Sequence, residues 1–224
     1  MADMRAFREA VTAEAAVGSG EPGEPVRELA GRLSVRTAVL LEGLSDAAAV
    51  DALAERRGLD LEGRGICVLP MGGAMSVGRF ARLLGPSPGL GLRLTGLCDE
   101  RERRFYARAL EEAVTTAGTE QRQRQRQRQR FFVCSADLED ELIRTLGVAR
   151  VEEIIRAEGD LRALQTLQQQ PAQQGRTAQQ QLRRFLGTKK GRKIHYGRAL
   201  VEALEPDRVP APLDDLFDEL LVGL

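Results

Sequence analysis

The sequence has little histidine and cysteine, and this scarcity argues against the common zinc sites. His195 is the single histidine, and three cysteines, Cys67, Cys98 and Cys134, lie far apart in the 224 residues. Structural and catalytic zinc sites usually draw several ligands from these two residue types. The cysteines are odd in number and each lies in an apolar segment, so we expect buried, reduced thiols in a cytoplasmic protein.

A surplus of charge and a long apolar run are also missing. Basic and acidic residues number 33 each, so the formal net charge is zero and any nucleic-acid surface must be local. No apolar run reaches the length of a membrane span, and the N-terminus lacks the apolar core of a signal peptide. The hydrophobic fraction of 42% and the charged fraction of 29% are typical of a folded globular chain.

What the chain does contain is a repeated pattern of short apolar runs separated by helical spacing. The runs cover Thr37–Leu41, Gly65–Pro70, Leu92–Cys98 and Phe131–Cys134. Runs of this length are typical of buried strands, and strands that alternate with helices form βαβ units with a mainly parallel sheet. The sequence therefore predicts a Rossmann-like α/β fold with about four mainly parallel strands flanked by helices. Because βαβ crossovers are right-handed, the carboxyl ends of the strands share one edge.

Changes in composition predict three regions. Residues 1–35 form an N-terminal helical segment, and residues 36–148 form the α/β core. Residues 149–224 carry further helical patterns, which predict a helical C-terminal extension packed on the core.

Inside the core, a Gln-Arg repeat runs from Gln121 to Arg130. We interpret this low-complexity segment as a solvated insertion. The alternative is a flexible arm that touches phosphates, although charge alone gives only non-specific, salt-sensitive binding.

Acidic residues follow three of the four predicted strands. Glu42 and Asp46 follow the first strand, Asp99 the third, and Asp137 and Glu139 the fourth. On a parallel sheet these carboxylates share one rim, and clustered carboxylates repel one another unless a cation neutralises them. Ligands that offer only oxygen favour magnesium or manganese over zinc.

Helix capping is a simpler explanation for part of this pattern. Ser45 and Asp46 open a segment of good helix formers, where their side chains would bind free backbone N–H groups. Taken alone, this explanation is the better one for the first strand end. The repetition of acids at further strand ends favours a cation site.

In this order, the residues resemble the Toprim (topoisomerase–primase) domain. The resemblance rests on Val39-Leu-Leu-Glu42-Gly-Leu-Ser-Asp46, on the pair Gly72-Gly73 and on Leu97-Cys-Asp99. The motif Ala136-Asp137-Leu-Glu139-Asp-Glu-Leu142, followed by a basic helix, is similar to the Toprim part of the OLD (overcoming lysogenization defect) nucleases. The resemblance covers about residues 36–204.

The resemblance implies a nuclease that hydrolyses phosphodiester bonds in DNA with two magnesium or manganese ions. It implies metal ligands at Glu42, Asp46, Asp99, Asp137 and Glu139. It also implies a lysine in the basic helix that stabilises the phosphate, with Lys193 as the first choice and Lys189 as the second. Glu42 is a further candidate for accepting the proton of the attacking water.

Two features depart from the family pattern. The family's Asp-x-Asp is here Asp99-Glu100-Arg101, so either Glu100 or Glu102 substitutes for the second aspartate or one ion is held more weakly. OLD proteins also carry an ATPase before the Toprim domain, whereas this chain has no Gly-x-x-x-x-Gly-Lys-Ser/Thr loop. We therefore expect a standalone Toprim unit with a separate ATPase partner; a homodimer is a further option.

Three other functions are considered. Topoisomerase chemistry needs a tyrosine nucleophile, for which Tyr106 and Tyr196 are the only candidates. The second is a catalytically weak or inactive Toprim module that binds nucleic acid or an ATPase. The third is a phosphohydrolase of small molecules, which ranks last because the nucleophilic Asp-x-Asp of phosphoaspartate enzymes is missing.

Overall fold

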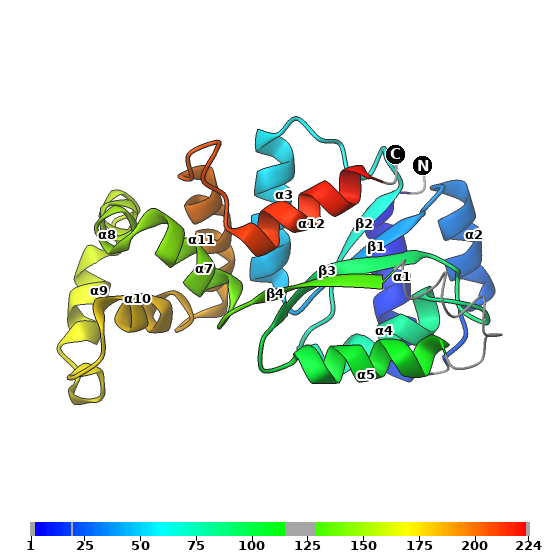
Figure 1. Cartoon of the computed structure of the whole chain (residues 1–224), viewed down its shortest axis with the longest axis horizontal. Coiled ribbons are helices and arrows are strands. Elements are labelled where there is room, and N and C mark those ends of the chain that lie inside the picture. Colours follow the sequence, from blue (N-terminus) through cyan, green and yellow to red (C-terminus); the bar gives the residue numbers. More distant parts are fainter. Residues whose placement is uncertain (1–2, 19, 115–128, 223–224) are drawn as a thin grey trace.

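The protein is built around a four-stranded parallel sheet with helices on both faces (Figure 1). The structure is a computed structural model that describes residues 3–18, 20–114 and 129–222. The strands are β1 (Thr37–Leu41), β2 (Ile66–Pro70), β3 (Arg93–Asp99) and β4 (Gln129–Cys134), in the spatial order β2-β1-β3-β4. The predicted α/β fold class is confirmed.

The strand order creates a crevice between β1 and β3. The chain leaves β1 through α3 (Leu44–Arg56) toward β2, and it leaves β3 through α5 (Arg103–Val114) toward β4. All strand pairs are parallel, so the carboxyl ends of β1 and β3 are neighbours at one edge. Open parallel sheets bind ligands where two connections part in this way.

Alternate side chains of the strands enter two separate apolar cores. Ala38 and Leu40 of β1 face α1 (Met4–Val17), α2 (Glu24–Arg32), α4 (Val77–Leu84) and α5. Val39 and Leu41 face α3 and the C-terminal helices. Because both faces of the sheet are buried, β1 and β2 are almost entirely apolar in sequence, and β3 and β4 each contain an apolar run.

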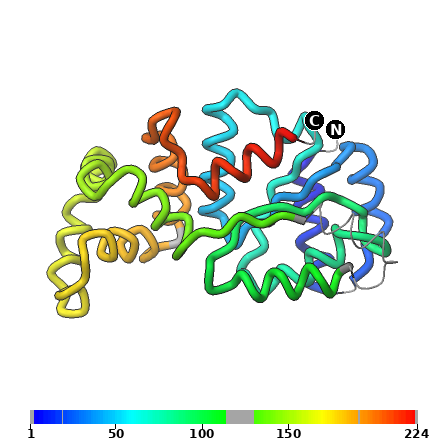
Figure 2. The backbone as a smooth tube through the Cα atoms, in the orientation of Figure 1, coloured from blue at the N-terminus to red at the C-terminus, as the bar shows by residue number. Residues whose placement is uncertain are grey.

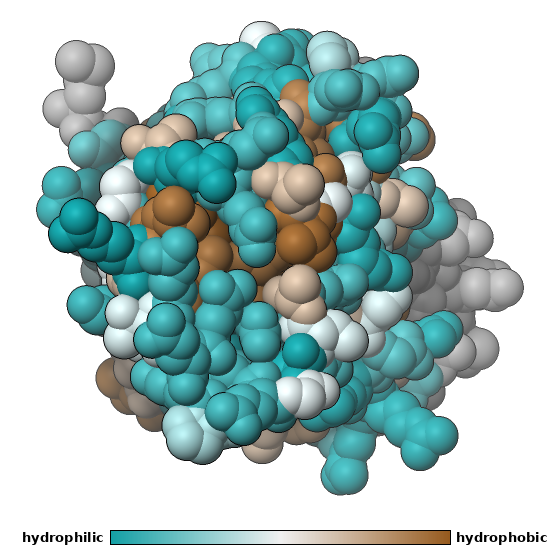
Figure 3. All heavy atoms as spheres, turned by 90° about the vertical axis from the view of Figure 1, so that its left-hand side faces the viewer, coloured by the Kyte–Doolittle hydropathy of each residue, from teal (hydrophilic) through white to brown (hydrophobic). Residues whose placement is uncertain are grey.

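The described chain after β4 is helical. These helices are α7 (Leu138–Leu146), α8 (Val148–Ala157), α9 (Leu161–Gln168), α10 (Ala178–Leu186), α11 (Lys190–Glu202) and α12 (Ala211–Leu221). Helices α8 to α10 lie at one end of the molecule, on the left in Figures 1 and 2, whereas α11 packs along α3 and α12 against β3 and β4. Seen from that end, the surface is mostly hydrophilic around a smaller apolar area (Figure 3). The predicted boundaries at residues 35 and 148 stay predictions.

The Gln-Arg repeat is in part a strand. Gln129 and Arg130, its last two residues, belong to β4 and pair with Leu94 and Thr95 of β3. The prediction of an insertion up to residue 130 was therefore wrong at this end, since backbone pairing with β3 outweighs the polar composition. Residues 121–128 lie outside the described residues, so their prediction stays open.

The prediction of buried cysteines without a disulfide is confirmed, because Cys67, Cys98 and Cys134 are free and buried. Within the described ranges, no helix combines the length and the apolar character needed to cross a membrane.

Candidate active site

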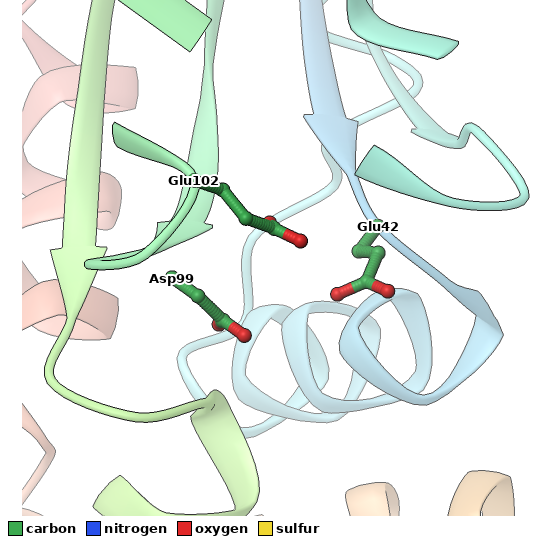
Figure 4. A group of neighbouring side chains, drawn as sticks. All are labelled: Glu42, Asp99 and Glu102. Carbon is green, nitrogen blue, oxygen red and sulfur yellow. The ribbon is translucent and has the colours of Figure 1, made fainter. Parts of the chain in front are cut away.

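Three carboxylates converge at the crevice between β1 and β3. Glu42 directly follows β1, Asp99 ends β3, and Glu102 lies three residues further along the chain. One oxygen from each carboxylate lies within 4.8 Å of the other two. Figure 4 shows the three side chains pointing toward one another from two different strand ends. We call Glu42, Asp99 and Glu102 the β1–β3 group.

A tight turn after β3 places Asp99 and Glu102 side by side. The backbone N–H of Glu102 donates to the carbonyl oxygen of Asp99 at 2.9 Å. A turn of four residues brings its first and last residues together, so the carboxylate at the fourth position reaches the crevice. Glu100 is instead exposed and lies 3.8 Å from Arg103. Of the two candidates for the missing aspartate, Glu102 is the one beside Asp99.

The β1–β3 group concentrates negative charge without a basic partner. Among the described residues, none of its carboxylates forms an ion pair. Burial, reinforced by the surrounding carboxylates, raises the pKa of Asp99 to about 7. Burial and then Glu42 also raise the pKa of Glu102, whose Oε2 is buried and finds no hydrogen-bond partner in the described part of the chain. An unpartnered buried carboxylate oxygen is unfavourable, and a bound cation would relieve it.

The turn after β2 holds the backbone next to this group. The backbone N–H of Gly73 donates to the carbonyl oxygen of Glu42 at 2.9 Å. Gly72 and Gly73 have φ angles of 74° and 129°, a region that side chains disfavour. The glycine pair therefore lets the chain fold back onto the end of β1 and fixes the position of Glu42.

Asp46 combines a capping role with strong burial. Its Oδ2 accepts a hydrogen bond from the backbone N–H of Gly43 at 2.9 Å, which satisfies a free donor at the start of α3. Burial and then repulsion from Glu139 raise the pKa of Asp46 to about 7, while Lys193 acts in the opposite direction. Helix capping thus accounts for the contact of Asp46 with Gly43. Asp46 also interacts electrostatically with Glu139, Lys193 and Glu42, which are candidate residues of the site.

The acids of α7 have basic partners from the protein itself. Asp137 caps α7 by accepting from the backbone N–H of Asp140 at 2.8 Å, and its other oxygen lies 2.6 Å from Nε of Arg183. Glu139 is buried, with Oε1 3.2 Å from Nζ of Lys193. Burial raises the pKa of Glu139 although Lys193 lowers it. We call Asp137 and Glu139 the α7 group.

A close helix contact brings Lys193 to this edge of the sheet. Gly197 lies one turn after Lys193 on α11, and a Cβ added at Gly197 would lie 2.5 Å from the carbonyl oxygen of Ser45 on α3. Residues four apart share a helix face. The absence of a side chain at Gly197 therefore lets the face that carries Lys193 approach the site.

The two candidate lysines differ in their surroundings. Burial opposes the charge of Lys193, but Glu139 and Asp46 outweigh it and raise its pKa. Lys193 is therefore positively charged at neutral pH. Lys189 is exposed before the start of α11 and forms no ion pair with a described residue.

Two pockets meet at Lys193. One, of about 580 Å³, lies at the ends of β1 and β2 and is lined by Glu42, Gly72 and Gly73 among others. The second, of about 610 Å³, lies between α7, α10 and α11 and contains the α7 group. Lys193 lines both pockets, so a ligand that passes over Lys193 has room on either side.

Comparison with known proteins identifies the segment that carries much of this site. Residues 35–100 match the family of the overcoming lysogenization defect protein-like TOPRIM domain. This segment is an OLD-like Toprim domain. The match includes Glu42, Asp46 and Asp99 and ends before Glu102. The resemblance predicted from the sequence is confirmed.

Solved structures extend the likeness beyond the Toprim segment. The C-terminal region of the Xanthomonas campestris pv. campestris OLD protein is 25% identical, with a TM-score of 0.59 over 85% of this chain and 96% of that one. The C-terminal region of the Burkholderia pseudomallei OLD protein shares the fold at 20% identity, with a TM-score of 0.61 over 84% of this chain and 98% of that one. A comparison with curated proteins finds no match.

The predicted ligands of the Toprim site fall into separate places. Glu42 and Asp99 lie together with Glu102, whereas the other predicted ligands, Asp46, Asp137 and Glu139, lie outside that group. The roles of all five residues as metal ligands stay predictions. The signal for Glu102 in the sequence is an acid at the fourth position of a turn that starts at a strand end.

Neither tyrosine is available as a nucleophile. Tyr106 and Tyr196 are each 1% exposed. Burial raises the pKa of both hydroxyl groups. This argues against transesterification of the topoisomerase type.

Proposed function

We propose that this protein is a divalent-metal-dependent nuclease that hydrolyses phosphodiester bonds in DNA. The observation that carries the proposal is the β1–β3 group, three carboxylates within 4.8 Å at the crevice of an OLD-like Toprim fold. The position is the one at which open parallel sheets bind ligands.

The β1–β3 group fits a hard divalent cation. It offers only carboxylate oxygens, and Oε2 of Glu102 is a buried acceptor without a hydrogen-bond partner among the described residues. Such ligands suit magnesium or manganese. Glu42, Asp99 and Glu102 would hold this ion, which when bound would act as a Lewis acid toward the phosphate and lower the pKa of a water molecule.

A second ion would have to compete with the protein's own cations. Asp137 binds Arg183 and Glu139 binds Lys193, so an ion at the α7 group must displace or share these contacts. We therefore assign the first ion to the β1–β3 group and treat a second ion near the α7 group as the weaker one.

The chain supplies candidates for the remaining steps. Lys193 is cationic at neutral pH and lies between the two pockets, where it would stabilise the charge on the phosphate oxygens. Glu42 would accept the proton of the attacking water, since its carboxylate lies in the β1–β3 group.

A plasmid-nicking assay with Mg²⁺ or Mn²⁺ tests the proposal. The wild type is expected to nick DNA, and Glu42→Gln is expected to abolish nicking. Glu28→Gln serves as the matched control, because Glu28 is exposed on α2 and its pair with Arg32 is a surface contact of small energetic value. DNA binding by the wild type without cleavage under either metal would contradict the proposal.

One observation favours a second candidate, a Toprim module that binds nucleic acid or a partner ATPase without cutting. Arg101 stands where the family has its second aspartate, and the α7 group is already neutralised by Arg183 and Lys193. The nicking assay separates the candidates, since the module binds DNA and leaves it intact. The ATPase partner itself stays a prediction from the resemblance.

A further inference from the structure

The pocket between α7, α10 and α11 has more basic than acidic side chains. Its charged lining consists of two carboxylates, the α7 group, and four basic side chains, Arg176, Arg183, Arg184 and Lys193. Arg183 and Lys193 neutralise the two carboxylates. The remaining positive charge comes from Arg176 in the turn before α10 and Arg184 on α10 itself.

Arg176 and Arg184 lack a partner within the described residues. Neither side chain forms an ion pair or a hydrogen bond there. Exposed arginines on other helices either pair with a glutamate about one turn away, as Arg108 and Arg150 do, or have no partner among the described residues, as with Arg156 and Arg162. Arg176 and Arg184 differ from the second kind because both line one pocket. Two unpaired guanidinium groups that line one pocket indicate a ligand with negative charge, and the planar guanidinium matches a phosphate in particular.

The pocket adjoins the candidate active site at Lys193, which lines both it and the pocket beside Glu42. We propose that Arg176 and Arg184 bind a phosphate next to the scissile one in a nucleic-acid strand. This inference rests on the proposed nuclease function and adds a contact outside the scissile phosphate, which a polynucleotide can make and an isolated phosphodiester cannot. The scissile phosphate lies at the β1–β3 group and Lys193, and the strand continues into the arginine-lined pocket.

Binding of a fluorescein-labelled single-stranded 12-mer in EDTA, measured by anisotropy over a series of salt concentrations, tests the contact without any hydrolysis. The pocket variant is Arg176→Gln/Arg184→Gln. The control variant is Arg156→Gln/Arg162→Gln, which removes the same charge from α8 and α9 at exposed positions outside the pocket.

The pocket variant is expected to bind the 12-mer at least tenfold more weakly than the control variant. Its slope of log K against log salt is expected to fall by about 0.7, since one neutralised phosphate of a single strand contributes about 0.7 to the slope. Equal affinities and equal slopes for the two double variants would overturn the inference.

A second measurement compares substrates in Mn²⁺. The preference for the 12-mer over thymidine 5′-p-nitrophenyl phosphate, taken as the ratio of their kcat/KM values, is expected to fall at least tenfold in the pocket variant. A preference that stays unchanged would contradict the assignment, because the small ester has no neighbouring phosphate. If the wild type hydrolyses neither substrate, the proposed function fails, and the binding measurement in EDTA still decides the inference.

Discussion

The two acidic groups at the carboxyl edge of the sheet contain the same residue types and differ in what neutralises them. The α7 group has Arg183 at 2.6 Å from Asp137 and Lys193 at 3.2 Å from Glu139. The β1–β3 group has no ion pair among the described residues, and the pKa of its Asp99 rises to about 7. The protein thus pairs the acids of one group with its own basic side chains, whereas the other group has no such partner among the described residues and is the one to which we assign the proposed cation.

The difference follows from where each group lies. α7 packs against α10 and α11, which carry arginine and lysine to its N-terminus. The β1–β3 group lies in the crevice between two strands, where no basic side chain of the described residues forms an ion pair with it. Substitutions in and around the two groups should therefore have different consequences.

Removing the charge of Lys193, which pairs with Glu139 of the α7 group, is expected to have the largest effect on DNA cleavage among the variants below. Lys193→Met should lower kcat for DNA cleavage by roughly 10²- to 10³-fold, as the loss of a donor to developing phosphate charge does in other enzymes. Steady-state kinetics measure this, with circular dichroism to verify folding. Lys189→Met is the control, because Lys189 is exposed and lies outside both pockets. A larger loss of kcat in Lys189→Met than in Lys193→Met would show that Lys189, and not Lys193, stabilises the charge on the phosphate.

Neutralising one member of the β1–β3 group should weaken metal binding. Glu102→Gln is expected to raise the dissociation constant for Mn²⁺ at least tenfold, measured by electron paramagnetic resonance of free Mn²⁺. Glu100→Gln should bind Mn²⁺ like the wild type, since Glu100 is exposed and faces Arg103. The reverse order of the two variants would show that Glu100, and not Glu102, takes the place of the missing aspartate.

A side chain at position 197, where α11 contacts α3, should destabilise the protein. Gly197→Ala should lower the free energy of unfolding by about 1–3 kcal/mol, because the new methyl group meets the backbone of Ser45. Gly191→Ala on the same helix has open space and should be neutral or stabilising by up to about 1 kcal/mol. Urea denaturation measures the free energy of unfolding of both variants. Equal changes in the two variants would contradict a close contact between Gly197 and the backbone of Ser45.

The last prediction concerns how protein stability depends on pH through Asp46. The charges that act on Asp46 include Glu139 of the α7 group and Glu42 of the β1–β3 group. Its pKa rises in the folded protein from 3.8 to about 7. Between these values the folded state binds more protons than the unfolded state, so stability in EDTA falls as the pH rises from about 4 to 7. Asp46→Asn should therefore be more stable than the wild type at pH 8, where the buried Asp46 is charged in the folded state.

This gain of Asp46→Asn should disappear below pH 4. The exposed Asp207→Asn, between α11 and α12, is the control and should show no such dependence. Thermal unfolding at several pH values measures both variants. Equal stability of Asp46→Asn and the wild type at pH 8 would contradict the burial of a charged Asp46.

The sequence allowed the strands and part of the site to be predicted, because these depend on local patterns. The apolar runs predicted the strands, and Glu42 and Asp99 could be placed at strand ends. The adjacency of β1 and β3 could not be predicted, since it depends on which face each connection crosses. The sequence left Glu100 and Glu102 as two options for the missing aspartate. Which of them lies beside Asp99 depends on the conformation of the turn after β3, which the sequence alone did not give.

Long-range pairing was also beyond the sequence. Arg183 and Asp137 are 46 residues apart, and no local pattern joins them. Lys193 could be chosen from the basic segment only by resemblance, whereas its position depends on Gly197, whose role emerges from the contact between α11 and α3. Contacts between residues of different helices could therefore be identified only from the structure.

A crystal structure of the protein soaked with Mn²⁺, with anomalous diffraction recorded, tests the central claim most directly. We expect an anomalous peak within bonding distance of Glu42, Asp99 and Glu102, with any second peak near the α7 group at lower occupancy. A peak at the α7 group alone, or no peak at the crevice between β1 and β3, would contradict it.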